Sequence, residues 1–150
     1  MHTLREAVDR HKKTGESAEA TADAVLADAK ASKKRISGYG HRIHTKDPRT
    51  VRLFALADEA GKSGPYVTMA KALADAFERQ GKALPINVDG AMAAVLCELD
   101  FDPQLANAFF IMARVPGIVA HVYEERTRQK PMRKIDPNTW AYDGPDTRNV

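Results

Sequence analysis

The sequence predicts an all-α fold, on three observations. Apolar residues recur at helical spacing, as in the stripe formed by Val67, Ala70 and Leu73. Alanine, the strongest helix former, is plentiful, whereas aromatic residues make up only 7% of the chain. Glycine and proline separate the periodic segments, and no segment has the alternation that a strand of useful length needs. We therefore expect a helical protein without internal repeats.

The first part of the chain predicts four helices. A short amphipathic helix is expected over 4–13 and a second over 17–32, after which two glycines open a loop. The third, over 47–60, begins with Asp-Pro, because aspartate caps helices and proline suits the first helical position. The fourth, over 66–79, has the clearest apolar stripe and ends at a glycine.

The second part predicts a short apolar helix over 91–99 and the longest helix over 104–127, which Pro116 should kink. The tail after Lys130 reads as irregular. Residues 106–122 are apolar on almost every side, as in a helix at the centre of a larger bundle. With 150 residues, the chain offers few helices to surround that segment. We infer that partner helices are supplied from elsewhere.

Composition excludes several classes of protein. The chain has 150 residues, 43% hydrophobic and 29% charged, which is typical of one soluble globular domain. The net charge of +3, from mixed signs, does not favour nucleic acid but suits a polyanionic small molecule. A single cysteine, Cys97, fits a reducing cytoplasm. No leader is expected, and residues 106–123 are too polar, with Asn107 and Arg114 among them, to predict a membrane span.

Three segments carry residues suited to chemistry. In 38–44, glycines flank His41 and allow close approach of a ligand to the backbone. In 87–90, Asp89 lies between apolar segments, where a carboxylate can serve as a general base. In 113–117, Arg114 is embedded in the most apolar helix, and a buried arginine needs an anionic partner.

Each residue also has a structural interpretation. His41 could be structural, Asp89 could cap the following helix, and Arg114 could pair with a carboxylate in the core. His121 reads as a core histidine, and His44 as an exposed loop residue or a minor ligand contact.

Together the three segments resemble signatures of the citrate synthase family, in the same order and spacing. They read Gly-Tyr-Gly-His-Arg with Asp-Pro-Arg, then Pro-Ile-Asn-Val-Asp-Gly, then Ala-Arg-Val-Pro-Gly-Ile-Val-Ala-His. The resemblance extends from about Leu4 to Tyr142. Asn-Val-Asp-Gly followed by alanine, and Lys-Pro-Met-Arg at 130–133, are more similar to the citryl-CoA lyase branch, which includes the lyase module of ATP citrate lyase.

The resemblance implies roles for individual residues. Asp89 matches the catalytic aspartate of the family, and His41 matches the histidine at the ketone or hydroxyl oxygen of the oxaloacetate part. Arg49 and Arg114 match arginines that clamp substrate carboxylates, and Arg133 matches an arginine that reaches the neighbouring subunit. A planar guanidinium suits that task because it binds a carboxylate in two places.

The loop that opens at Ile36 matches the backbone that holds coenzyme A in the family. Gly38, Tyr39 and Gly40 belong to it, with Arg42 or Lys46 near the phosphates. The resemblance implies acetyl-CoA, oxaloacetate and citryl-CoA as reactants, with the coenzyme A thioester as substrate rather than as a permanent cofactor. No cluster with metal-ligand spacing occurs in the sequence, and we expect no metal.

The resemblance implies a small domain over 1–87 and the carboxyl-terminal helices of the large domain over 88–150. An upstream histidine of the family has no counterpart, since His2 and His11 lie in the wrong context. We therefore expect an enzyme part that forms a homodimer or needs a complementary amino-terminal chain. Two alternatives stay open: a non-catalytic remnant that binds a CoA ester or a partner protein, and a plain structural domain. The direction of reaction and the acyl substrate also stay open.

Overall fold

The computed structural model describes residues 1–43, 45–134, 136–138 and 141, so His44 and Tyr142 lie outside the described residues. All regular secondary structure within these ranges is helical, which confirms the predicted class. The chain divides into two compact units, Met1–Phe109 and Phe110–Val150. The elements are α1 (His2–Thr14), α2 (Ala18–Ala31), α3 (Pro48–Glu59), α4 (Pro65–Arg79), α5 (Val88–Glu98), the 3-10 turn η1 (Pro103–Leu105) and α6 (Ala106–Arg128).

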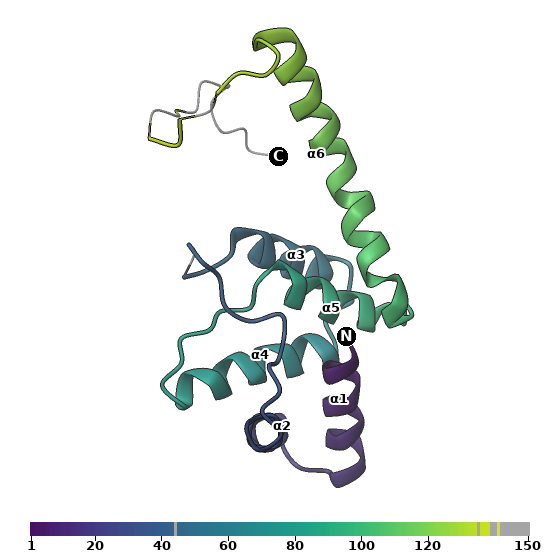
Figure 1. Ribbon diagram of the computed structural model, residues 1–150. Coiled ribbons are helices and arrows are strands. Elements are labelled where there is room, and N and C mark those ends of the chain that lie inside the picture. The colour runs from purple at the N-terminus through teal and green to yellow at the C-terminus, as the bar shows by residue number, and fades with distance from the viewer. Residues whose placement is uncertain (44, 135, 139–140, 142–150) are drawn as a thin grey trace. The chain divides into compact units, whose positions relative to one another are not determined.

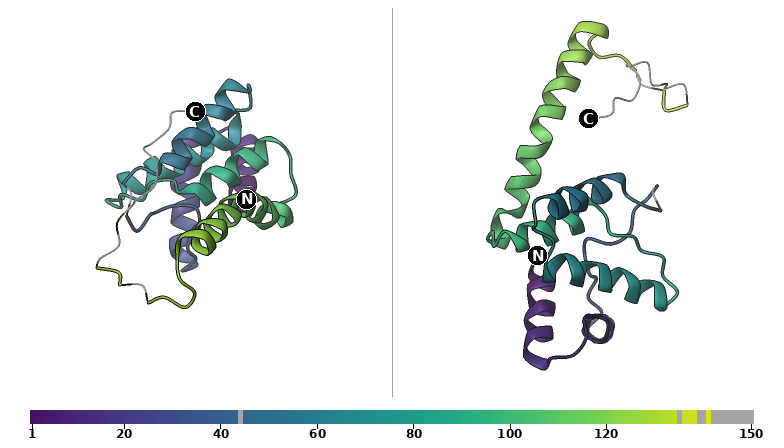
Figure 2. Two further views of the ribbon diagram at one scale, coloured as in Figure 1. Left: turned by 90° about the horizontal axis from the view of Figure 1, so that it is seen from above. Right: turned by 180° about the vertical axis from the view of Figure 1, so that it is seen from behind.

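Helix α4 is the centre of the first unit. It packs against α1, α2 and α5, and α5 packs in turn against α3 (Figures 1 and 2). Its inward face contains Ala70, Leu73 and Ala76, which are completely buried, as the apolar stripe in the sequence predicts. The α2–α3 and α4–α5 connections therefore both belong to this bundle. They contain the histidine and aspartate motifs predicted from the sequence.

The helix starts follow from local chemistry. The Asp47 side chain accepts a hydrogen bond from the Arg49 backbone, and Pro48 occupies the first turn of α3, as predicted. Helix α5 begins earlier than the expected residue 91. The reason is Asn87, whose side chain accepts hydrogen bonds from the backbone nitrogens of Asp89 and Gly90.

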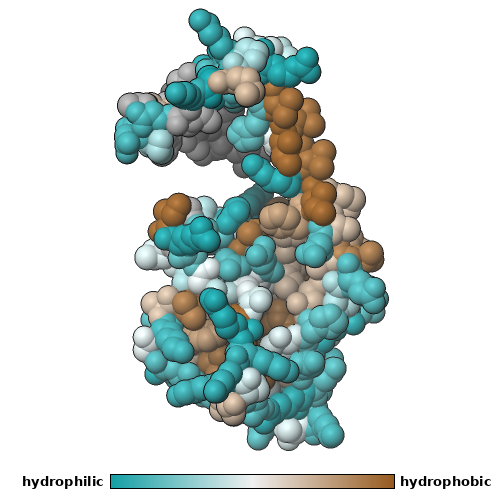
Figure 3. All heavy atoms as spheres, viewed as in Figure 1, coloured by the Kyte–Doolittle hydropathy of each residue, from teal (hydrophilic) through white to brown (hydrophobic). Residues whose placement is uncertain are grey.

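Helix α6 is the main element of the second unit, although its first residues belong to the first. It continues through Pro116 as one helix and contributes no buried residue. Phe110 is 42% exposed and Ile118 49% exposed, and Figure 3 shows apolar side chains along this helix. The inference that partner helices from elsewhere cover this segment stays a prediction.

Two further expectations about this part of the chain are not tested by the structure. Residues 103–128 are long and apolar enough to cross a membrane by length and composition, a criterion that core helices of soluble proteins also meet. The expected absence of a membrane span therefore stays a prediction. The expected boundary between domains at 87 and 88 also stays a prediction, because the division into units reflects packing within this chain alone.

Candidate active site

Two loops of the first unit pair with each other. We call 38–43 the histidine loop and 84–90 the aspartate loop. They meet in an antiparallel bridge between Tyr39 and Ile86. Three hydrogen bonds hold the pair: Gly40 N to Pro85 O at 2.7 Å, Asn87 N to Gly38 O at 3.0 Å, and Asn87 Nδ2 to Gly40 O at 2.9 Å.

Glycines at 38 and 90 make this pairing possible. Gly38 has φ of 95°, a conformation that side chains disfavour, and a Cβ on it would lie 2.8 Å from the Cα of Gly90. A Cβ on Gly90 would collide with the carbonyl oxygen of Gly38. The two glycines therefore allow the backbones of the histidine and aspartate loops to lie in direct contact.

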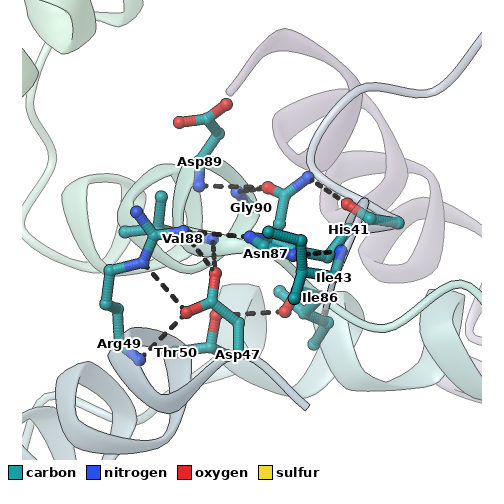
Figure 4. Close-up of polar contacts among 11 residues, drawn as sticks. His41, Ile43, Asp47, Arg49, Thr50, Ile86, Asn87, Val88, Asp89 and Gly90 are labelled. Atoms are coloured by element: carbon teal, nitrogen blue, oxygen red, sulfur yellow. Dashed lines mark hydrogen bonds and ion pairs between the residues drawn. The ribbon is translucent and has the colours of Figure 1, made fainter. Parts of the chain in front are cut away.

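Asp47 and Arg49 form an ion pair beside the aspartate loop (Figure 4). Arg49 donates from Nε to Oδ1 at 3.0 Å and from Nη2 to Oδ2 at 2.9 Å. These hydrogen bonds lower the pKa of Asp47 to about 2, against the opposing effect of burial. The pair fixes the side chain of Arg49, for which the family resemblance implies contact with substrate carboxylates.

His41 lies next to that guanidinium. Its Nδ1 accepts a hydrogen bond from the backbone nitrogen of Ile43 at 3.1 Å, which assigns the proton of the neutral ring to Nε2. Nη2 of Arg49 lies 3.4 Å from Nε2, so in this tautomer two donors lie side by side. Two adjacent donors suit an oxygen on which negative charge develops.

Asp89 lies in the first turn of α5 and is exposed, so the expectation of apolar surroundings for this carboxylate is wrong. The structural alternative is wrong too, because Asn87 and not Asp89 caps the helix. The carboxylates of Asp47 and, more weakly, Asp89 raise the pKa of Arg49. Asp89 therefore shares an electrostatic environment with the guanidinium that adjoins His41.

A pocket of about 580 Å³ is lined by the histidine loop, the end of α2 with the segment after it, and the end of α4 with the segment after it. Its polar lining is almost entirely cationic: Lys30, Lys34, Arg35, Arg42 and Lys82, with His41 and Gln80. Its apolar lining comprises Leu26, Ala29, Ile36, Tyr39, Phe77 and Leu84. Such a combination suits a polyanion with an apolar moiety.

The lining includes some of the residues expected to hold coenzyme A, and that expectation stays a prediction. Tyr39, Gly40 and Arg42 line the pocket, whereas Gly38 and Lys46 do not. The sequence analysis did not single out Lys30, Lys34, Arg35 and Lys82; the first three are neighbours in the sequence, and Lys82 joins them only because α2 and α4 pack together.

The remaining predicted residues belong to the second unit. Arg114 is exposed, so the expectation that it is buried with an anionic partner is wrong for this chain. Arg133 donates to Glu125 from Nε at 3.0 Å and from Nη2 at 2.8 Å. His121 is exposed, with its side chain 69% accessible, and its interpretation as a core histidine is wrong. The substrate contacts expected of Arg114 and Arg133 stay predictions.

Comparison with known proteins agrees with this architecture. Residues 1–135 match the family described as citrate synthase, C-terminal domain. The chain belongs to the citrate synthase family. Citrate synthase of Synechocystis sp. is 36% identical over 109 residues, which are 69% of this chain and 28% of the relative. The ATP-citrate synthase beta chain protein 2 of Arabidopsis thaliana is 26% identical over 115 residues, which are 65% of this chain and 19% of that protein.

Solved structures show the same fold. Citryl-CoA lyase from Hydrogenobacter thermophilus aligns with a TM-score of 0.70 and 37% identity, covering 99% of this chain and 57% of that one. Citrate synthase from Thermotoga maritima aligns with a TM-score of 0.63 and 26% identity, covering 99% and 41%. The family and the fold predicted from the sequence are thus confirmed. The chain spans less than a third of the Synechocystis relative, so the activity of a whole enzyme is a matter for proposal.

Proposed function

We propose that this chain is the carboxyl-terminal part of an enzyme that makes or breaks the carbon–carbon bond between acetyl-CoA and oxaloacetate, by way of citryl-CoA. The observation that carries the proposal is the pairing of the histidine and aspartate loops through Gly38 and Gly90. That pairing brings together the loops that carry His41 and Asp89, which stand far apart in the sequence, and Arg49 lies next to His41.

The three side chains divide the chemistry between them. In condensation, Asp89 takes a proton from the methyl carbon of acetyl-CoA, and the resulting enol carbon attacks the ketone of oxaloacetate. The proton on Nε2 of His41 moves to the ketone oxygen as it becomes a hydroxyl. Arg49 holds a carboxylate of the substrate beside that oxygen. Cleavage of citryl-CoA follows the same steps in reverse.

The cationic pocket suits coenzyme A. Its five lysine and arginine side chains match phosphate groups, and its apolar lining matches an adenine ring or the pantetheine arm. The pocket shares His41 with the paired loops, so a thioester that lies in it can extend toward Asp89. In this proposal Arg114 and Arg133 add carboxylate contacts in the complete enzyme.

The proposal requires the rest of the enzyme. Helix α6 exposes Ile111, Val115 and Val119 along much of its length, and contiguous apolar surface of this kind is uncommon on soluble monomers. We propose that this helix contacts a second copy, or the upstream part of the enzyme that carries the additional family histidine, in the cytoplasm. The upstream part can belong to a longer chain or be a separate polypeptide.

Reconstitution tests the proposal. Citryl-CoA is supplied to this chain alone, to an upstream polypeptide of the family alone, and to both, and release of oxaloacetate is coupled to malate dehydrogenase. We expect turnover only from the combination. It should be lost when Asp89→Asn replaces the wild-type chain. Turnover that persists undiminished with Asp89→Asn would contradict the proposal.

Binding without catalysis is the second candidate function, and the cationic pocket favours it. Calorimetry with coenzyme A distinguishes the two. A chain that binds coenzyme A but never supports turnover in the reconstituted mixture is a CoA-ester-binding protein.

A further inference from the structure

Asp47 is the most completely buried carboxylate among the described residues, with no side-chain exposure. Its two oxygens accept four N–H groups (Figure 4). Oδ1 accepts from the backbone nitrogen and Nε of Arg49, both at 3.0 Å. Oδ2 accepts from Nη2 of Arg49 at 2.9 Å and from the backbone nitrogen of Val88 at 3.1 Å. A carboxylate so occupied is poorly placed to exchange protons with a substrate.

The four contacts join two parts of the site. Val88 is the first residue of α5 and directly precedes Asp89, and its N–H is one of those that a helix start leaves without an intrahelical partner. Arg49 stands at the start of α3. Asp47 therefore ties the arginine to the turn that carries Asp89.

The geometry also orients the guanidinium. Asp47 occupies Nε and one N–H of Nη2, so the edge formed by Nη1 and the second N–H of Nη2 can face a ligand. The arginine side chain is 55% exposed, and without this contact it would be able to sample many rotamers.

We propose that Asp47 is a positioning residue, which fixes the direction of the Arg49 guanidinium and its spacing from Asp89. This inference rests on the proposed function of the site. A capping residue alone would stabilise α3 and α5 without any effect on ligand selectivity.

Asp47→Asn is the informative substitution. Asparagine keeps the shape, but its amide nitrogen is a donor that must face donors of Arg49 in either orientation, together with the Val88 N–H in one of them. The histidine and aspartate loops should remain paired, because their mutual hydrogen bonds do not involve Asp47. Helix α3 should remain docked on the aspartate loop, because Thr50 Oγ1 still donates to the Ile86 carbonyl at 3.0 Å. Loss of the negative charge alone would strengthen anion binding at Arg49. Loss of the Arg49 orientation would instead weaken anion binding. Whether the affinity for citrate rises or falls therefore distinguishes the charge effect from the orientation effect.

Glu98→Gln is the matched control. Glu98 is the last residue of α5, and its half-buried carboxylate lies at the start of α4, where Oε1 accepts from the backbone nitrogens of Gly64, Tyr66 and Val67. It contacts none of the site residues in these hydrogen bonds. Its neutralisation should lower thermal stability as Asp47→Asn does, while affinities for citrate and for coenzyme A stay within about twofold.

Calorimetry with citrate and with coenzyme A on the full chain gives the first readout. We expect Asp47→Asn to weaken citrate binding at least about tenfold and to change coenzyme A binding less than about twofold. Citrate binding that is unchanged or tighter in this variant overturns the inference, as does an equal loss for both ligands.

The Nε–Hε resonance of Arg49, assigned by its disappearance in Arg49→Lys, gives a readout that needs no ligand. It should be sharp in the wild type and broadened in Asp47→Asn. Equal line widths overturn the inference. If the wild-type chain and its reconstituted complex bind no citrate, the proposed function fails, and these line widths alone decide whether Asp47 fixes the arginine.

Discussion

Replacement of Gly38 by alanine should separate the two loops of the site. The new Cβ would lie 2.8 Å from the Cα and 3.2 Å from the backbone nitrogen of Gly90, and backbone cannot rotate away as a side chain can. Separation would break the three hydrogen bonds between the loops, each of which contributes about 1 kcal/mol. The positive φ adds roughly 1 kcal/mol for any residue with a side chain.

Comparison with Gly81→Ala separates the steric collision at residue 38 from the cost of a positive φ. Gly81 has φ of 75°, but a Cβ there meets nothing within 4 Å. Both variants therefore have the cost of the backbone conformation, and only Gly38→Ala has the collision. Urea denaturation followed by circular dichroism should show Gly38→Ala to be less stable than Gly81→Ala by about 2–3 kcal/mol. A difference below about 0.5 kcal/mol would refute the argument that this glycine is required for loop pairing.

Three further predictions follow from the site. Asp89→Asn should lower turnover of the reconstituted enzyme by about 10²–10⁴ in steady-state assays and leave the melting temperature unchanged; a loss below about tenfold would mean that Asp89 is not the base. The pKa of Asp47 falls from 3.8 to about 2 in the folded chain, so its ion pair stabilises the chain above about pH 4, and this contribution disappears as the pH falls to about 2. The ion pair contributes roughly 1–2 kcal/mol to the free energy of unfolding after allowance for the exposure of Arg49. The difference in stability between wild type and Asp47→Asn, measured by urea titration, should therefore shrink as the pH falls from about 4 to about 2. Lys82→Ala should weaken coenzyme A binding several-fold in calorimetry and leave citrate binding unchanged. An equal loss for both ligands would contradict the assignment of the pocket to coenzyme A.

Helices were predictable where capping chemistry is explicit in the sequence. Asp47 before Pro48 marks the start of α3 where the structure has it. The start of α5 was missed because Asp89 was the only cap considered, whereas Asn87 caps the helix in the structure. This matters for function, because it leaves the Asp89 carboxylate available for chemistry.

Features that depend on packing between distant segments were not predictable. The capping interpretation of Asp47 was correct but incomplete, since its contact with Val88 spans 41 positions in the sequence. The pocket cations Lys30 and Lys82 converge for the same reason. Burial of Arg114 was predicted from the apolar character of its helix, but no residue of that helix is buried within the described part of the chain.

A citrate titration of the isotopically labelled chain, followed by NMR, tests the central claim most directly. If the paired loops form one anion site, the backbone resonances of His41 and Asp89 and the side-chain resonance of Arg49 should shift together, with a single dissociation constant. Gly64 and Tyr66, beside Glu98, should not move. Shifts confined to other surfaces, or separate dissociation constants for His41 and Asp89, would contradict the account.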